Sequence, residues 1–152
     1  MQLSRFTDLG LRSLMRLAVS SGADERVTVK LIARQVNASE NYVAKAVSKL
    51  AELGYVESQR GRTGGIFLTE AGRTTTIGTI VRQLEGDEEV IDCAGVNPCP
   101  LANACRLRGL LATAQNAFYA ELDRYRLSDL VDQRTVELLH LPVFPAAELI
   151  DT

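Results

Sequence analysis

The chain has 152 residues, of which 46% are hydrophobic, so it can bury the core of one domain of ordinary size. It has no apolar run of about 18 residues, as a membrane span would need, and its opening MQLSRFTDLGLRSL lacks the features of a secretory signal. We therefore expect a cytoplasmic protein with no membrane partner. In that reducing compartment, three cysteines are more readily free, catalytic or metal-bound than paired in disulfides.

The net charge of -2 hides a difference between the two halves of the chain. Residues 1–75 hold 11 Lys and Arg against 7 Asp and Glu, whereas the remaining residues hold 6 against 12. A basic first half is compatible with nucleic-acid binding, but ordinary charge scatter explains it equally well. The position of the basic residues must decide.

The first half has the pattern of a helix-turn-helix. Apolar spacing over residues 8–20 predicts an amphipathic helix with Thr7 as its N-cap. Thr28 can cap a second helix over residues 29–36, and a third is predicted from Ser39 to residue 53, just before a glycine. The tight turn between the second and third helices is typical of the helix-turn-helix.

A β-hairpin is predicted directly after the third helix. Residues 55–60 alternate like a strand, residues 61–65 form a glycine-rich turn with arginines, and residues 66–69 return as a second strand. Helix, helix-turn-helix and hairpin in this order predict a winged helix, with the hairpin as its wing. The expected fold is mainly α with a small β wing.

The second half is expected to carry a long dimerisation helix. A helix over residues 77–84 precedes an acidic, irregular stretch, 85–100, after which apolar residues recur at steps of three and four. This stripe consists of Ala104, Leu107, Leu111, Ala114, Phe118, Leu122 and Tyr125. A partner subunit would cover it economically, although packing within its own domain is the alternative.

The pattern divides the chain into three regions within one compact domain. These are a winged-helix DNA-binding region over 1–75, a cysteine segment with the dimerisation helix over 76–131, and a C-terminal tail over 132–152. A last short helix is expected near residues 128–131, and residues 142–152 resemble a poorly ordered tail.

One face of the third helix carries residue types that read DNA. If Val43, Val47 and Leu50 face the core, the opposite face, at about 100° per residue, is polar. Asn, Lys and Ser can bond base edges, and the wing can contact phosphate or a minor groove. A solvated helix face and an arginine-containing loop are the alternative. The predicted contacts to double-stranded DNA are Asn41, Tyr42, Lys45, Ser48, Lys49, Arg60, Arg62, Gly64 and Gly65.

Three cysteines form a candidate metal site. Cys93, Cys99 and Cys105 are separated by five residues each in CAGVNPCPLANAC, where glycine and two prolines oppose regular helix. Structural zinc prefers shorter gaps and four ligands, whereas iron-sulfur clusters are held by thiolates and can accept one different ligand. The spacing leaves an iron-sulfur cluster, zinc and unligated thiols all open.

The single histidine does not complete this site on sequence grounds. His140 lies far downstream, and we interpret it as a structural or surface residue. No phosphate loop, nucleophile elbow or second histidine indicates catalysis, so an enzyme is not expected. An enzyme or electron carrier that uses a cluster remains the rival class, but it leaves the wing and the third helix unexplained.

With these features in hand, the chain resembles the NsrR family of nitric-oxide-sensing repressors, related to the iron-sulfur regulator IscR. The motifs are MQLSRFTDLGLRSL, RGRTGGIFLT, IGTIVRQLEG and CAGVNPCPLANACRL. The resemblance implies a homodimer crossed by the long helix, an iron-sulfur cluster that supports operator binding, and release of DNA when nitric oxide attacks that cluster. An IscR-type redox-responsive regulator and a winged helix with structural zinc are the alternatives.

The resemblance also implies a ligand set. Cys93, Cys99 and Cys105 would hold the cluster, and Asp8 would be an oxygen ligand from the other subunit. From the residues alone, Asp8 is an acidic residue in a first helical turn, where the helix dipole favours it. Three cysteines and one carboxylate favour a 4Fe-4S cluster over the 2Fe-2S alternative.

Overall fold

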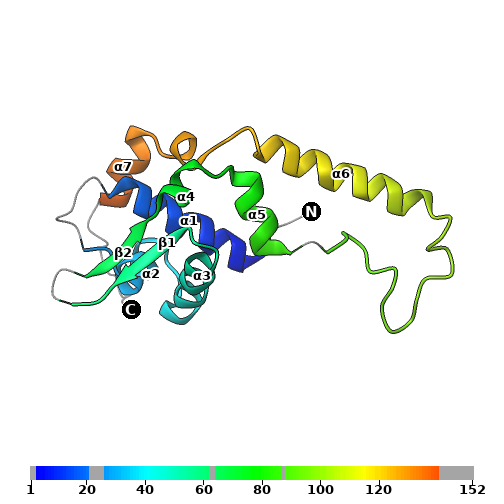
Figure 1. Ribbon diagram of the computed structural model, residues 1–152, viewed down its shortest axis with the longest axis horizontal. Coiled ribbons are helices and arrows are strands. Elements are labelled where there is room, and N and C mark those ends of the chain that lie inside the picture. Colours follow the sequence, from blue (N-terminus) through cyan, green and yellow to red (C-terminus); the bar gives the residue numbers. More distant parts are fainter. Residues whose placement is uncertain (1–2, 21–25, 62–63, 87, 141–152) are drawn as a thin grey trace, which may run out of the picture.

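A computed structural model of the chain describes residues 3–20, 26–61, 64–86 and 88–140. The described part is mainly helical with one two-stranded antiparallel sheet, as predicted. Figure 1 shows a body that contains the wing and a long helix, α6, that projects from it. None of the helices within these ranges has the length and hydropathy that a membrane crossing requires.

The first helix, α1 (Arg5–Val19), begins earlier than predicted. Its N-cap is Ser4, whose hydroxyl accepts a hydrogen bond from the backbone N–H of Thr7 at 3.2 Å. Thr7 was the expected cap, but it lies inside the first turn and is fully buried. The prediction was wrong because two hydroxyl residues precede the apolar stripe and either can cap.

The helix-turn-helix agrees closely with the prediction. Helix α2 (Val29–Gln35) is capped by Thr28 and helix α3 (Glu40–Glu52) by Ser39. Between them, Asn37 adopts a positive φ of 52°, a conformation that asparagine tolerates better than most residues. The core beneath α1, α2 and α3 is formed by side chains that are completely buried, among them Leu14, Ile32, Val43 and Leu50.

The wing consists of β1 (Val56–Gln59) and β2 (Gly65–Leu68). Val56 pairs with Leu68 and Gln59 with Gly65. The backbone N–H of Ile66 donates to the carbonyl of Val27 at 2.9 Å, which attaches the wing to the segment before α2. The wing and the helix-turn-helix are therefore held as one unit.

A short helix, α4 (Glu70–Thr74), follows the wing and was not predicted. Thr69, expected to end the second strand, instead caps this helix through the backbone N–H of Gly72 at 3.1 Å. A Cβ at Gly72 would lie 2.2 Å from the carbonyl oxygen of Tyr55, so this glycine allows close packing on the wing. Helix α5 (Ile77–Glu85) then matches its prediction within one residue.

The long helix, α6 (Arg106–Leu122), is attached to the body at its C-terminal end. The hydroxyl of Thr76 donates to Asp123 at 2.6 Å, and the guanidinium of Arg82 lies 4.6 Å from the ring centroid of Tyr119. A Cβ at Gly78 would lie 2.6 Å from the carbonyl oxygen of Tyr119. This close contact between α5 and α6 fixes the orientation of α6 relative to the body.

Only part of the apolar stripe of α6 is covered by its own chain. Phe118 and Leu122 of the stripe pack against the core beside the buried Tyr119, but Leu107 of the stripe and Leu110, which lies next to the stripe, are 55% and 65% exposed. The N-terminal half of the helix therefore carries uncovered apolar side chains in a single chain.

The chain after α6 differs from the prediction. The expected short helix is a 3-10 turn, η1 (Leu127–Leu130), and it is followed by a further helix, α7 (Gln133–His140). Gln35 of α2 donates to the carbonyl of Leu139, so α7 packs beside the helix-turn-helix. The tail over 142–152 and the side chain of His140 lie outside the described part of the chain.

Candidate nucleic-acid interface and cysteine loop

Helix α3 presents the predicted polar face to solvent. Val43, Val47 and Leu50 are buried, whereas the opposite side is exposed. The predicted orientation of the helix is therefore confirmed. The exposed residues on this side are Asn41, Tyr42, Lys45 and Ser48.

Tyr42 is flanked by two cations. Its side chain is 53% exposed, and the Arg5 guanidinium and the Lys45 ammonium lie 5.7 and 5.9 Å from its ring centroid. Both distances suit cation–π attraction. Sequence reasoning did not single out Arg5, because only the packing of α1 against α3 brings it beside the recognition face.

Lys49 is less available than its neighbours on α3. Its ammonium forms an ion pair with Glu52 at 3.0 Å, and its side chain is 36% exposed. A contact between Lys49 and a DNA phosphate would have to compete with this carboxylate. Lys45, which is exposed, is therefore the better candidate for a contact to DNA.

The wing glycines have an intramolecular role that the sequence did not indicate. A Cβ at Gly64 would lie 2.2 Å from the carbonyl oxygen of Gln59, so Gly64 is needed for the hairpin backbone itself. A Cβ at Gly65 would lie 3.1 Å from the carbonyl oxygen of Val27. Gly64 is buried and Gly65 is half-buried in the single chain, and their predicted contacts to DNA stay predictions. Arg60 is exposed at the wing, and Arg62 lies outside the described residues.

The Lys45→Ala variant is expected to weaken binding of a specific DNA site by about 1–3 kcal/mol, the usual value of a base contact. Lys49→Ala, which removes a cation already paired with Glu52, is the matched control and should have a smaller effect. Fluorescence anisotropy with specific and scrambled duplexes measures both. Equal losses on the two duplexes would exclude base reading by Lys45.

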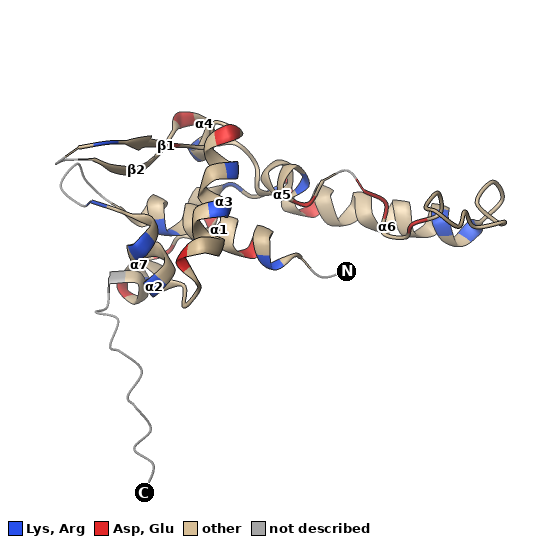
Figure 2. Cartoon of the chain, turned by 90° about the horizontal axis from the view of Figure 1, so that it is seen from below, with Lys and Arg blue, Asp and Glu red and all other residues tan. Residues whose placement is uncertain are grey.

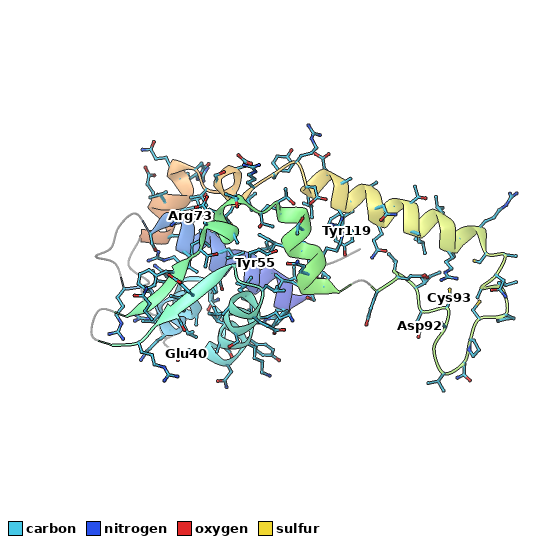
Figure 3. All side chains as sticks on the ribbon, in the orientation of Figure 1. Glu40, Tyr55, Arg73, Asp92, Cys93 and Tyr119 are labelled. Atoms are coloured by element: carbon cyan, nitrogen blue, oxygen red, sulfur yellow. The ribbon has the colours of Figure 1, made fainter. Side chains whose placement is uncertain are left out.

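The three cysteines lie in one segment, the cysteine loop (residues 93–105), at the end of α6 that projects away from the body (Figures 1 and 3). All three are free thiols; Cys93 is buried and Cys99 and Cys105 are half-buried. The backbone N–H of Cys99 donates to the carbonyl of Cys93 at 3.1 Å, which closes the first half of the loop. Cys105 is the N-cap of α6, where the helix dipole favours an anionic ligand.

The thiols influence one another electrostatically. Burial raises the pKa of Cys93, and negative charge on Cys99 and Cys105 raises it further, whereas Arg108 lowers it. Without a metal, Cys93 is therefore protonated at neutral pH. A metal cation would reverse this by stabilising the thiolates, as expected where metal binding releases protons.

The donor chemistry of the loop fits a thiolate-ligated cofactor. Three thiols are available, and a cavity of about 460 Å³ lies beside Cys93, bordered by Glu89 and Arg108. Among the described residues, however, no three side chains of His, Cys, Asp or Glu already surround a common point. Binding would have to draw the thiols of this short loop together.

Asp8 is not brought to the cysteines of its own chain. It lies on α1 within the body, while the cysteine loop is at the far end of α6 in both views (Figures 1 and 2). Its side chain is 44% exposed and forms an ion pair with Arg12, with an Nε–Oδ1 distance of 2.7 Å. One chain thus holds the thiols and Asp8 at separate places.

Comparison with known proteins agrees with this architecture. Residues 3–133 match the Rrf2 family, described as an iron-dependent transcriptional regulator. The HTH-type transcriptional repressor NsrR of Streptomyces coelicolor is 51% identical over 139 residues, which cover 91% of this chain and 94% of that protein. The HTH-type transcriptional regulator NsrR of Geobacillus kaustophilus is 39% identical, covering 88% and 92%.

Solved structures of the same kind show the same fold. CymR, the global cysteine regulator of B. subtilis, superposes with a TM-score of 0.65 at 31% identity and covers 86% of this chain and 95% of its own. IscR of T. potens has the same TM-score at 23% identity, covering 86% and 85%, and supports the fold alone.

Together, the fold and these relatives define a winged-helix transcriptional regulator that binds DNA. The chain belongs to the Rrf2 family. The resemblance to NsrR proteins noted in the sequence is confirmed by relatives that cover most of the chain.

Proposed function

We propose that the chain is a homodimeric repressor that holds an iron-sulfur cluster on Cys93, Cys99 and Cys105 and releases its operator in response to nitric oxide. The observation that carries this proposal is the presence of three free thiols in one short loop of a winged-helix protein. The repressor name of the Streptomyces relative supports the direction of regulation. We expect the protein in the cytoplasm, where thiols stay reduced.

The uncovered half of α6 supports a homodimer. Leu107 and Leu110 are more than half exposed on a helix that projects from the body (Figure 2). Large apolar side chains grouped in this way usually mark a protein interface. A second copy that contributes the same stripe would cover both helices and leave the two α3 helices free to enter successive major grooves of a palindromic site.

A dimer crossed by α6 would also explain the separation of Asp8 from the thiols. We propose that the cysteine loop of one subunit approaches α1 of its partner, so that Asp8 supplies the fourth, oxygen ligand. Its exposed carboxylate would exchange its ion pair with Arg12 for this role. Three thiolates and one carboxylate favour a 4Fe-4S cluster, with 2Fe-2S as the alternative.

The Asp8→Ala variant is expected to assemble a cluster that decays faster in air, because one ligand of four is lost. Decay is followed by visible absorption of anaerobically prepared protein without DNA. Glu40→Ala, which removes an exposed carboxylate from the first turn of α3, is the control. An unchanged decay rate for Asp8→Ala would remove Asp8 from the ligand set.

In the proposed mechanism, the protein couples the cysteine loop to the recognition helices through α6. The cluster, when bound, supplies iron that reacts with nitric oxide. Cys93, Cys99 and Cys105 would hold the cluster and so keep the loop closed, and the contacts of α6 with Thr76 and Arg82 connect the loop to α5 and the body. If the bonds between the iron and its cysteine and Asp8 ligands were lost, the cysteine loop would no longer be tied to α1 of the partner. The separation of the two α3 helices would then change.

Titration of nitric oxide into the anaerobic, cluster-bound protein on its operator tests the function. Visible absorption and DNA retention are followed together, with metal-free protein as the control. A coupling of about 3 kcal/mol would lower affinity by more than about a hundredfold, enough to empty an operator. If absorption changes while DNA retention persists, the sensor proposal fails. If the protein as purified is colourless and contains zinc, the alternative of structural zinc replaces it.

A further inference from the structure

An ion pair joins the two ends of the cysteine loop. Glu89 lies four residues before Cys93, and Arg108 lies three residues after Cys105, in the first turn of α6. Arg108 binds the Glu89 carboxylate through two nitrogens, with an Nε–Oε2 distance of 2.7 Å and an Nη2–Oε1 distance of 2.5 Å. This bidentate geometry is the strong form of an arginine–carboxylate contact.

Two further hydrogen bonds join α6 to the cysteine loop and to the residues just before it. Arg108 also donates from Nη1 to the carbonyl of Ala102 inside the loop, at 3.5 Å. The amide of Gln115, two turns further along α6, donates to the carbonyl of Glu88 at 2.9 Å. The chain that enters the loop is therefore held along one side of α6.

This side of α6 differs from the one that carries the uncovered apolar residues. At about 100° per residue, Arg108 and Gln115 lie on one side of the helix, whereas Leu107 and Leu110 are displaced from Arg108 by about 100° and about 160° around the helix. Arg108 and Glu89 are 41% and 47% exposed, so the pair is accessible in the single chain. The pair can therefore be altered without changing Leu107 or Leu110.

Arg108 also acts on the thiols: burial raises the pKa of Cys93, the positive charge of Arg108 lowers it, and both residues border the same cavity. The Glu89 carboxylate is the main reason that the pKa of Arg108 lies above its usual value, and negative charge on Cys93 and Cys105 raises it further. When the loop holds iron, the three thiolate ligands and the proposed carboxylate ligand, Asp8 of the partner, would give the site an excess of negative charge. A fixed guanidinium beside two of the thiolates offsets part of this charge.

We propose that Arg108 and Glu89 are positioning residues of the cysteine site: the pair closes the loop before iron is bound, and Arg108 then stays beside the thiolates as their positive neighbour. The inference rests on the proposed function, because it takes the three cysteines as the ligands. Its physical basis is that a loop whose ends are already joined loses less conformational entropy when three thiols are drawn together.

Hydrogen exchange of the full-length, metal-free, reduced protein tests the first part directly. In Arg108→Ala and in Glu89→Ala, amides of residues 93–105 should exchange about threefold to tenfold faster, as expected for loss of a partly exposed bidentate pair. Arg106→Ala, which removes an exposed arginine from the same helical turn, should not change their exchange. Because the two residues act as a pair, the double variant should exchange no faster than either single variant. Unchanged exchange in the single variants, or additive effects in the double variant, would overturn the inference.

Anaerobic reconstitution with ferrous iron and sulfide tests the second part. Arg108→Ala should assemble the cluster about threefold to tenfold more slowly than the unaltered protein, and Arg108→Lys should recover only part of the rate, because lysine keeps the charge without the planar fork. If the unaltered protein binds no iron, the proposed function fails whatever the pair does in exchange. If it binds iron and Arg108→Ala does so at the same rate, the present inference fails and the proposed function stands.

Discussion

Replacement of any one of Cys93, Cys99 or Cys105 with serine is expected to abolish stable assembly of an iron-sulfur cluster, and it is the largest effect that we expect on cofactor content. A serine hydroxyl does not ionise near neutral pH and is a poor ligand for iron, so two thiolates and one carboxylate would remain. The fold should survive, because the cysteine loop lies outside the core that packs α1, α2, α3 and α5.

The measurement is iron and sulfide content after anaerobic reconstitution, together with circular dichroism and thermal unfolding. Val96→Ser is the matched control, since Val96 lies between the first two cysteines and is fully exposed. This control should keep its cluster. A cysteine variant that retains the full visible spectrum would show that its thiol is no ligand, and a variant that unfolds would show that the loop has a structural role that we have not assigned.

A double variant in which both Leu107 and Leu110 are replaced with glutamate is expected to be a monomer. These side chains are 55% and 65% exposed in the single chain, so charges there should not disturb its own core. In a dimer crossed by α6 they would be buried, and an unpaired carboxylate in such an interface is strongly unfavourable. Each subunit would then bind only half of a palindromic site. Affinity for the whole site should fall by more than about a hundredfold, because binding of the second half-site would no longer be helped by a subunit already held on the first.

Analytical ultracentrifugation gives the oligomeric state, and anisotropy gives the affinity for DNA. Asn116→Glu serves as the control, because Asn116 is exposed on the same helix but lies away from the stripe. It should remain dimeric. Dimerisation of the double variant would place the interface elsewhere, and dissociation of the control would mean that added charge on α6, not its position, drives the change.

The recognition helix was predictable because the relevant signals are local. Ser39 caps α3, and the spacing of Val43, Val47 and Leu50 alone defines which side is buried. The same applies to α2, where Thr28 marks the beginning. Local capping and periodicity involve residues within about one helical turn, so they are visible without any knowledge of the fold.

The start of α1 and the short helix α4 were missed for a different reason. The backbone N–H of Ser4 donates to the carboxylate of Glu85 at 2.8 Å, a contact across 81 residues that favours Ser4 as the cap. Gly72 weakens the helical pattern of α4, yet the fold requires it there because a Cβ would meet the carbonyl of Tyr55. In both places a distant contact outweighs the local preference.

By itself, the sequence determined the winged helix, the side of α3 that faces solvent and the grouping of three thiols in one segment, because capping, periodicity and spacing act over short stretches of chain. Only the tertiary structure decided that Arg5 joins Tyr42, that Asp8 is far from the thiols of its own chain, and that Arg108 joins Glu89 across the cysteine loop. The relative positions of these residues depend on how the helices pack against one another and project from the body. That packing is determined by the whole core, so it cannot be read from the few residues that come into contact.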